Sequence, residues 1–258
     1  MRGVNLASCL EHSVHAHPGK VALIFEEERW TFRELDAEAN RIANGLVELG
    51  VEKGDRIAFL LVNSPTYVFA FFAAMKLGAV GVNLSVGIQG EELARCLKAS
   101  GAKVVVTLDL FAQNVYQVIR ATEVKGVILH SVFGIEKRMS VQEGLPQPLI
   151  FQDLIESAGS AGEPKVQVSA RDTAMLQYTR GSTGAPKAAT LTHANLVASV
   201  MQADRERCLQ AGMDDFIGKP FAMGELLARM RAVWPEARTV CTPLQSFVGG
   251  RYDVVLAL

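Results

Sequence analysis

Glycines, hydroxyl side chains and a lysine are concentrated in one stretch of this chain, residues 178–187. Its two glycines allow the backbone to bend where a side chain would block close approach to a phosphate. A serine and a threonine between them add hydroxyl donors, and successive N–H groups of such a loop can form an anion-binding nest. The stretch predicts a phosphate-binding loop, although its first seven residues alone also fit a flexible surface loop. The residues that carry the prediction are Gly181, Ser182, Thr183, Gly184 and Lys187.

The residues on either side of this stretch predict the strand and the helix that should surround the loop. The apolar run Ala174–Tyr178 predicts a strand that leads into the loop, and Thr192 can cap a helix that begins around His193. A strand, a glycine-rich turn and a helix start form a setting suited to phosphate. The spacing from Gly181 to Lys187 does not fit the Walker pattern G-x-x-x-x-G-K-[ST]. His193 is either an ordinary first-turn helix residue or a residue with a direct catalytic role.

The whole string, continued by Leu-Thr-His-Ala-Asn over residues 191–195, resembles the phosphate-binding loop of the adenylate-forming superfamily. That superfamily includes acyl-CoA synthetases, luciferases and the adenylation domains of peptide synthetases. Two positions depart from its pattern: Arg180 replaces a usual serine or glycine, and Ala188 replaces the glycine that usually follows the lysine. The resemblance implies that the β/γ-phosphates of ATP are bound by Thr179, Gly181, Ser182, Thr183, Gly184 and Lys187.

Residues 20–130 alternate helical and strand patterns, which predicts an α/β fold with a parallel sheet and helices on both faces. Thr31 and Glu34 form a capping-box pattern, and the following helix should end at Gly50. Its expected buried stripe is Leu35, Ile42, Leu46 and Leu49. Ser64 should cap a second helix that ends at Gly78. Further strands are expected over residues 56–62, 79–84, 103–107 and 126–130, and further helices over residues 91–99, 111–122 and 153–157.

This half of the chain also resembles the N-terminal subdomain of the adenylate-forming enzymes. The matching segments, in family order, are Trp30–Leu35, Gly54–Arg56, Asn63–Pro65 and Lys76–Val80. Residues 83–86 depart from the pattern, because the family commonly has Asn-Pro just after this strand. The resemblance implies layered parallel sheets with flanking helices, as an incomplete N-terminal region of the adenylate-forming fold. The matching segments are expected to be scaffold and not site.

Composition excludes several classes of protein. With 49% hydrophobic residues among its 258 residues, the chain can bury a sizeable core. A net charge of −1 gives no sign of the positive surface that binds nucleic acid or an anionic membrane. The four cysteines are scattered without a C-x-x-C pair, which argues against a zinc site and fits a reducing cytoplasm. No signal peptide is visible, and the apolar stretch Ile57–Met75 is interrupted by Asn-Ser-Pro. We therefore expect a soluble, cytoplasmic protein with no transmembrane segment.

From Asp204 onward the chain resembles another family. Residues 204–230 resemble the last helix–strand–helix of response-regulator receiver domains, where the lysine at the position of Lys219 contacts an aspartyl phosphate. The remainder of a receiver, with its acidic pair for Mg²⁺ and its acceptor aspartate, is missing from the upstream sequence. Asp214 and Asp215 fall in the turn before the final strand, so we expect no phosphoryl acceptor here. An ordinary helix–strand–helix on the surface is the alternative.

Together the resemblances predict a chimera. Its expected parts are residues 1–202, the N-terminal portion of an AMP-binding domain; 203–232, a receiver-like segment; and 233–258, a truncated return to the AMP-binding domain. The implied activity is that of an AMP-forming acyl-CoA ligase acting on a fatty acid or related carboxylate, with ATP, Mg²⁺ and coenzyme A. The family's metal ligand and catalytic lysine are expected beyond residue 258, so this chain alone should not turn over. The alternatives are a non-catalytic fragment, or a signalling protein that uses the receiver-like segment.

Overall fold

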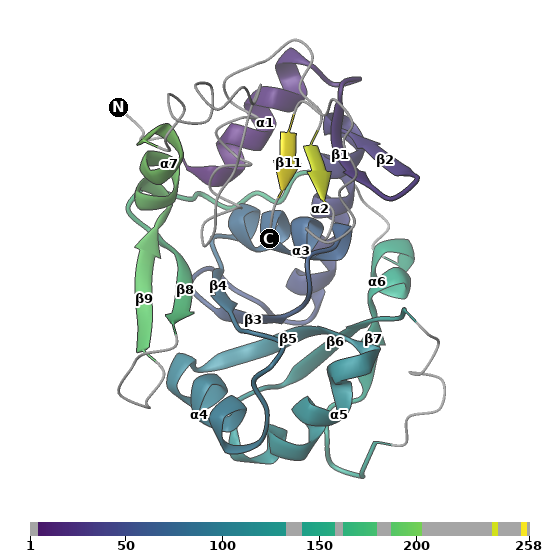
Figure 1. Ribbon diagram of the computed structural model, residues 1–258, viewed down its shortest axis with the longest axis vertical. Helices are drawn as coiled ribbons and strands as arrows, with labels where there is room; N and C mark the ends of the chain where they lie inside the picture. Colours follow the sequence, from purple (N-terminus) through teal and green to yellow (C-terminus); the bar gives the residue numbers. More distant parts are fainter. Residues whose placement is uncertain are drawn as a thin grey trace.

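The computed structural model of the chain describes residues 5–132, 141–157, 162–179, 187–202, 239–241 and 254–256. Its main feature is a seven-stranded sheet in the order β7-β6-β5-β3-β4-β8-β9 (Figure 1). Neighbouring strands are parallel except β8 and β9, which are antiparallel. The predicted α/β fold with a parallel sheet is confirmed. The strands are β3 Arg56–Leu60, β4 Val80–Asn83, β5 Ala102–Leu108, β6 Gly126–His130, β7 Pro148–Ile150, β8 Thr173–Thr179 and β9 Lys187–Thr192.

Helices cover both faces of this sheet. The central strand β3 has apolar side chains on both of its faces, so both faces must be buried. Ile57 and Phe59 belong to one core cluster, whereas Ala58 and Leu60 belong to the other, because successive strand residues point to opposite faces. The first cluster is covered by α1 Leu6–Ala16, α2 Phe32–Glu48, α3 Pro65–Leu77, α6 Phe151–Ser157 and α7 His193–Gln202. The second is covered by α4 Gly90–Ser100, α5 Asp109–Val118 and the 3-10 turn η1 Ile119–Ala121.

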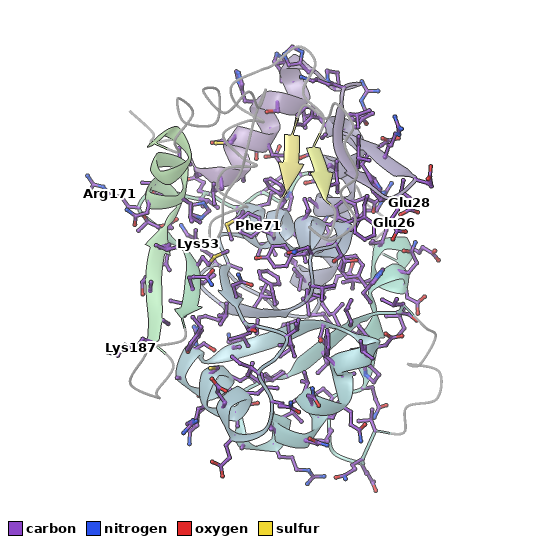
Figure 2. All side chains as sticks on the ribbon, viewed as in Figure 1. Glu26, Glu28, Lys53, Phe71, Arg171 and Lys187 are labelled. Carbon is purple, nitrogen blue, oxygen red and sulfur yellow. The ribbon has the colours of Figure 1, made fainter. Side chains whose placement is uncertain are left out.

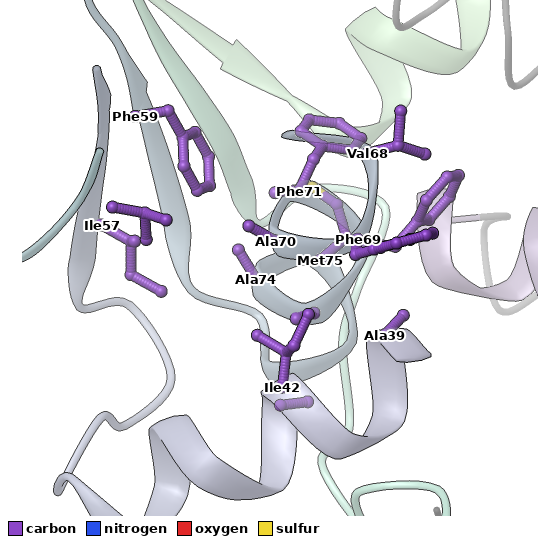
Figure 3. Close-up of a cluster of buried hydrophobic side chains, with 14 of the residues drawn as sticks. Ala39, Ile42, Ile57, Phe59, Val68, Phe69, Ala70, Phe71, Ala74 and Met75 are labelled. Atoms are coloured by element: carbon purple, nitrogen blue, oxygen red, sulfur yellow. The ribbon is translucent and has the colours of Figure 1, made fainter. Parts of the chain in front are cut away.

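The first core centres on α3, which is mostly apolar and is buried along almost its whole length. Figure 3 shows Ala70 and Ala74 of α3 facing the side chains of β3, with residues of α2 on the other side of the helix. Phe71 is fully buried, stacks on Tyr67 and meets Phe72 edge-on. The apolar stretch noted in the sequence is therefore a buried strand followed by a buried helix. Within the described ranges, no helix is long and apolar enough to cross a membrane.

The predicted caps are confirmed. Thr31 accepts the Glu34 N–H at 3.2 Å, and the Glu34 carboxylate accepts the Thr31 N–H at 2.7 Å. Ser64 caps α3, and Gly78 ends it in the left-handed conformation with φ of 62°. The prediction for Leu49 is wrong: α2 ends at Glu48, and Leu49 follows the helix with 40% of its surface exposed.

The sequence analysis did not predict a smaller sheet near the N-terminus, of order β11-β10-β1-β2. Its strands β1 Val21–Phe25 and β2 Glu28–Thr31 form a hairpin, and β10 Thr239–Cys241 pairs in parallel with both β1 and β11 Val254–Leu256. The hairpin turn places Glu26 at a φ of 52°, an uncommon value for a residue with a side chain. Helix α1 was also missed. The predicted division at residues 202 and 232 stays a prediction.

Candidate functional site

The predicted phosphate loop joins the two antiparallel strands β8 and β9. Thr179 is the last residue of β8 and is paired with Lys187, the first residue of β9. Lys187 is exposed and lies at the end of β9 away from α7 (Figure 2). The structure thus brings Thr179 and Lys187 together across the base of a seven-residue connection, residues 180–186. Gly181, Ser182, Thr183 and Gly184 lie outside the described residues, as does Lys219.

The predicted cap and helix start are confirmed, since the Thr192 hydroxyl accepts the Asn195 N–H at 3.1 Å at the start of α7. The prediction missed β9, which lies between the loop and this helix. Helix α7 begins at His193, and the six residues of β9 separate it from the loop. At about 3.3 Å per residue, β9 places the helix start roughly 20 Å from Lys187. The field of a helix N-terminus falls off within its first turn, so α7 cannot supply the loop's positive potential. Binding of a phosphate by the loop and Lys187 stays a prediction, and it receives no help from the α7 N-terminus.

The opposite end of the hairpin is held by a network of polar contacts. Asp172 and His193, the residues just outside β8 and β9, are joined by a hydrogen bond from the His193 N–H to the Asp172 carbonyl at 3.1 Å. The Asp172 carboxylate pairs with the Lys53 ammonium at 2.7 Å and accepts the Ser169 N–H at 2.7 Å. Lys53 first, and then the Ser169 N–H, hold the pKa of Asp172 below its usual value. These contacts anchor the hairpin to the turn before β3.

His193 is fully buried and serves this anchor. Its Nδ1 accepts the backbone N–H of Leu6 at 3.3 Å, which ties α7 to the start of α1. Burial lowers the pKa of His193 to about 4, so the imidazole is neutral at pH 7. A neutral ring with an accepting Nδ1 carries its proton on Nε2. These are the contacts of a packed first-turn helix residue, at the end of the hairpin remote from the loop.

The end of β8 that leads into the loop carries a second group of polar side chains. Asn83, the last residue of β4, donates its side-chain amide to the Gln177 Oε1 at 3.1 Å. The Tyr178 hydroxyl donates to the carbonyl of Cys96 in α4 at 3.2 Å, and burial raises the pKa of that hydroxyl. The sequence analysis missed Asn83 and Gln177. The adjacency of Gln177 to the loop was the available signal, but its partner lies 94 residues away.

Comparison with known proteins identifies the family. The family described as "AMP-binding enzyme" matches residues 10–223, most of the chain. The chain belongs to the AMP-binding enzyme family. A long-chain-fatty-acid–CoA ligase of Salmonella typhimurium is 30% identical over 214 residues, covering 77% of this chain and 38% of the relative. 4-Coumarate–CoA ligase 1 of Petroselinum crispum is 30% identical over 177 residues, covering 68% of this chain and 30% of the relative. The chain therefore spans well under half the length of these curated relatives.

Solved structures share this fold. The apo structure of Mycobacterium smegmatis MbtA matches with a TM-score of 0.77 at 26% identity, over 93% of this chain and 44% of that protein. The anthranilate CoA ligase AuaEII, solved with anthranoyl-AMP, matches with a TM-score of 0.70 at 24% identity, over 79% of this chain and 37% of that protein. The predicted resemblance to the N-terminal region of adenylate-forming enzymes is confirmed. The receiver-like segment stays a prediction.

Mg²⁺ is the metal ion that the resemblance to the adenylate-forming enzymes implies. None of its described residues form a group of three or more histidine, cysteine, aspartate or glutamate side chains able to hold a metal ion. Mg²⁺ is bound by oxygen ligands in octahedral geometry, usually with one or two carboxylates and substrate phosphates. Such a binding mode needs no group of three protein ligands, so Mg²⁺ stays a prediction.

Proposed function

We propose that this chain is the N-terminal part of an AMP-forming acyl-CoA ligase that activates a fatty acid or a related carboxylate. The observation that carries the proposal is the β8–β9 hairpin of an AMP-binding domain, which brings Thr179 and Lys187 together at the base of a glycine- and hydroxyl-rich connection. Coenzyme A ligases among the curated relatives support the reaction class. A cytoplasmic location remains part of the proposal.

In the proposed reaction the substrate carboxylate attacks the α-phosphorus of ATP, giving an acyl-adenylate and pyrophosphate. The thiol of coenzyme A then attacks the acyl carbon and displaces AMP. Negative charge develops on the departing pyrophosphate during the first step. Loop N–H groups, the Ser182 and Thr183 hydroxyls and the Lys187 ammonium would hold the β- and γ-phosphates and stabilise that charge. Lys187, anchored by backbone pairing with Thr179, is positioned as a point charge at the loop's exit.

The phosphate assignment is tested by ATP titration of the chain in a calorimeter. Lys187→Ala should weaken ATP binding about tenfold to a hundredfold, since one charge-assisted contact contributes about 1.5–3 kcal/mol. Lys98→Ala, which removes an exposed lysine from the last turn of α4, is the matched control and should leave the affinity unchanged. If Lys187→Ala bound ATP as tightly as the parent chain, the assignment of this loop as the phosphate site would be wrong.

The ligase assignment needs the rest of an enzyme. Residues 1–258 alone should form no acyl-adenylate above a heat-killed control, because the loop positions only part of ATP. Joined to the downstream region of a matching long-chain-fatty-acid–CoA ligase, the chain should support fatty-acid-dependent exchange of pyrophosphate into ATP. Lys187→Ala in that hybrid should reduce the exchange. Formation of acyl-adenylate by the isolated chain would show that the downstream region is not needed for catalysis.

A further inference from the structure

The end of β8 loses one of its two neighbours just before the predicted loop. The β4–β8 pairing comprises Gly81 with Met175, Val82 with Leu176 and Asn83 with Gln177, and it stops there. Tyr178 and Thr179 continue the strand with β9 as their only paired strand among the described residues. On the edge that faces β4, Tyr178 and Thr179 have no backbone pairing, so side-chain contacts must hold them in position.

Gln177 supplies such a contact. Its Oε1 accepts the Asn83 side-chain amide at 3.1 Å, and its Nε2 donates to the Tyr178 carbonyl at 3.3 Å. A carbonyl can only accept, so the amide nitrogen must face Tyr178 and the amide oxygen must face Asn83. The single side chain thus connects the end of β4 to a backbone carbonyl one residue past the last β4–β8 pair.

The strand end is also held on the other face of the sheet. The Tyr178 hydroxyl donates to the carbonyl of Cys96 in α4, on one face of the sheet. Gln177 lies on the opposite face, on the side of α3, because successive side chains of a strand point to opposite faces. Thr179 is held by its pairing with Lys187. Three contacts in three directions fix the final residues of β8.

We propose that Gln177, held by Asn83, is a positioning residue that fixes the exit of β8 for phosphate binding by the adjoining loop. The inference rests on the proposed function, because it presumes that the loop takes a polyphosphate. Gln177 acts through the Tyr178 carbonyl and not by contact with the ligand. A loop that must present several N–H groups to one anion loses affinity when the direction of its entry strand is relaxed.

The test is the affinity of the chain for inorganic tripolyphosphate, measured by calorimetry together with the thermal midpoint. Gln177→Met keeps the length of the side chain and removes both hydrogen bonds. It should weaken binding about threefold to tenfold, the equivalent of one or two neutral hydrogen bonds. Gln152→Met, at an exposed glutamine of α6, is the matched control and should bind as the parent chain does.

The thermal midpoint separates positioning from general destabilisation. If Gln177 positions the loop, Gln177→Met should weaken binding while its thermal midpoint stays well above the assay temperature. The loss should also be seen in the Lys187→Ala background, because the loop N–H groups remain there. Equal affinity of Gln177→Met and the parent would overturn the inference and leave the phosphate site standing. Equal affinity of Lys187→Ala and the parent would instead overturn the proposed function. If Gln177→Met does not fold, Asn83→Ala tests the Asn83–Gln177 bond from its other end, with a loss of about threefold because only one hydrogen bond is removed.

Discussion

The pH dependence of stability should be set in part by Glu11, which joins a charged cluster between the first three helices. Lys76 of α3 is almost fully buried, with its ammonium 2.9 Å from Asp36 Oδ1 and 3.8 Å from Glu11 Oε1. Burial raises the pKa of Glu11 from 4.5 to about 7; Lys76 opposes this rise, and the carboxylates of Glu163 and Asp36 add to it. Burial outweighs the ion pair because Lys76 lies closer to Asp36 than to Glu11.

The sign and size of the effect follow from this pKa. Between pH 4.5 and about 7 the folded chain holds a proton on Glu11 that the unfolded chain releases. The stability it contributes is fully present below pH 4.5 and is lost as the pH rises through 7. A rise of that size corresponds to roughly 3.4 kcal/mol at 1.36 kcal/mol per pH unit. The Glu11 side chain is 38% exposed, so solvent screening reduces the expected effect to about 1–2 kcal/mol.

The assay compares the parent chain with Glu11→Gln in urea unfolding at pH 5 to 8.5. The comparison is needed because His193, with a pKa lowered to about 4, acts in the opposite direction and destabilises the fold as the pH falls below 6.5. Near pH 5 the two chains should be about equally stable, because glutamine resembles a protonated glutamate. At pH 8 Glu11→Gln should be more stable by about 1–2 kcal/mol. A pH-independent difference, or a matching gain from Glu123→Gln at an exposed site, would refute the reasoning.

Three further outcomes are expected. Phe71→Ala should lower the free energy of unfolding by about 3–5 kcal/mol because it empties a fully buried site; a loss under about 1 kcal/mol would contradict the described core. Gly78→Ala should cost about 1–2 kcal/mol in the same assay, since φ is 62° and the new Cβ would meet side-chain carbons at 3.1 Å, whereas Gly19→Ala, with open space, should change little. Acetyl phosphate with Mg²⁺ should add no stable phosphate to the receiver-like segment by intact-mass measurement; an adduct lost on Asp214→Asn or Asp215→Asn would support the signalling alternative.

Local signals in the sequence predicted the elements that they specify directly. Capping residues such as Thr31 and Ser64, and the helix-ending Gly78, act within one turn, so sequence was enough to place those ends. Continuous apolar runs located the central strands because a parallel sheet is buried on both faces. The prediction that Leu49 is buried was wrong because α2 ends at Glu48, so Leu49 lies outside the helical stripe.

A strand with a weak strand sequence, and contacts between residues far apart in the chain, could not be found in this way. β9 reads Lys-Ala-Ala-Thr-Leu-Thr, a weak strand sequence with four exposed residues, and it is held by pairing with β8. The helix start at His193 was predicted correctly, but without β9 the separation of that start from the loop was not foreseen. The link from Asn83 to Gln177 spans 94 residues, and the ion pair between Lys53 and Asp172 joins residues even farther apart in the chain. Such pairs depend on strand order, which one sequence does not reveal.

The most direct test of the central claim is ³¹P NMR of ATP titrated with the chain. The account predicts that the β- and γ-phosphorus resonances shift or broaden more than the α resonance, because the loop between Thr179 and Lys187 holds the terminal phosphates. Lys187→Ala should remove most of that perturbation, and Lys98→Ala should preserve it. Perturbation confined to the α-phosphorus, or equal perturbation by the parent and Lys187→Ala, would contradict the assignment of this hairpin as the ATP phosphate site.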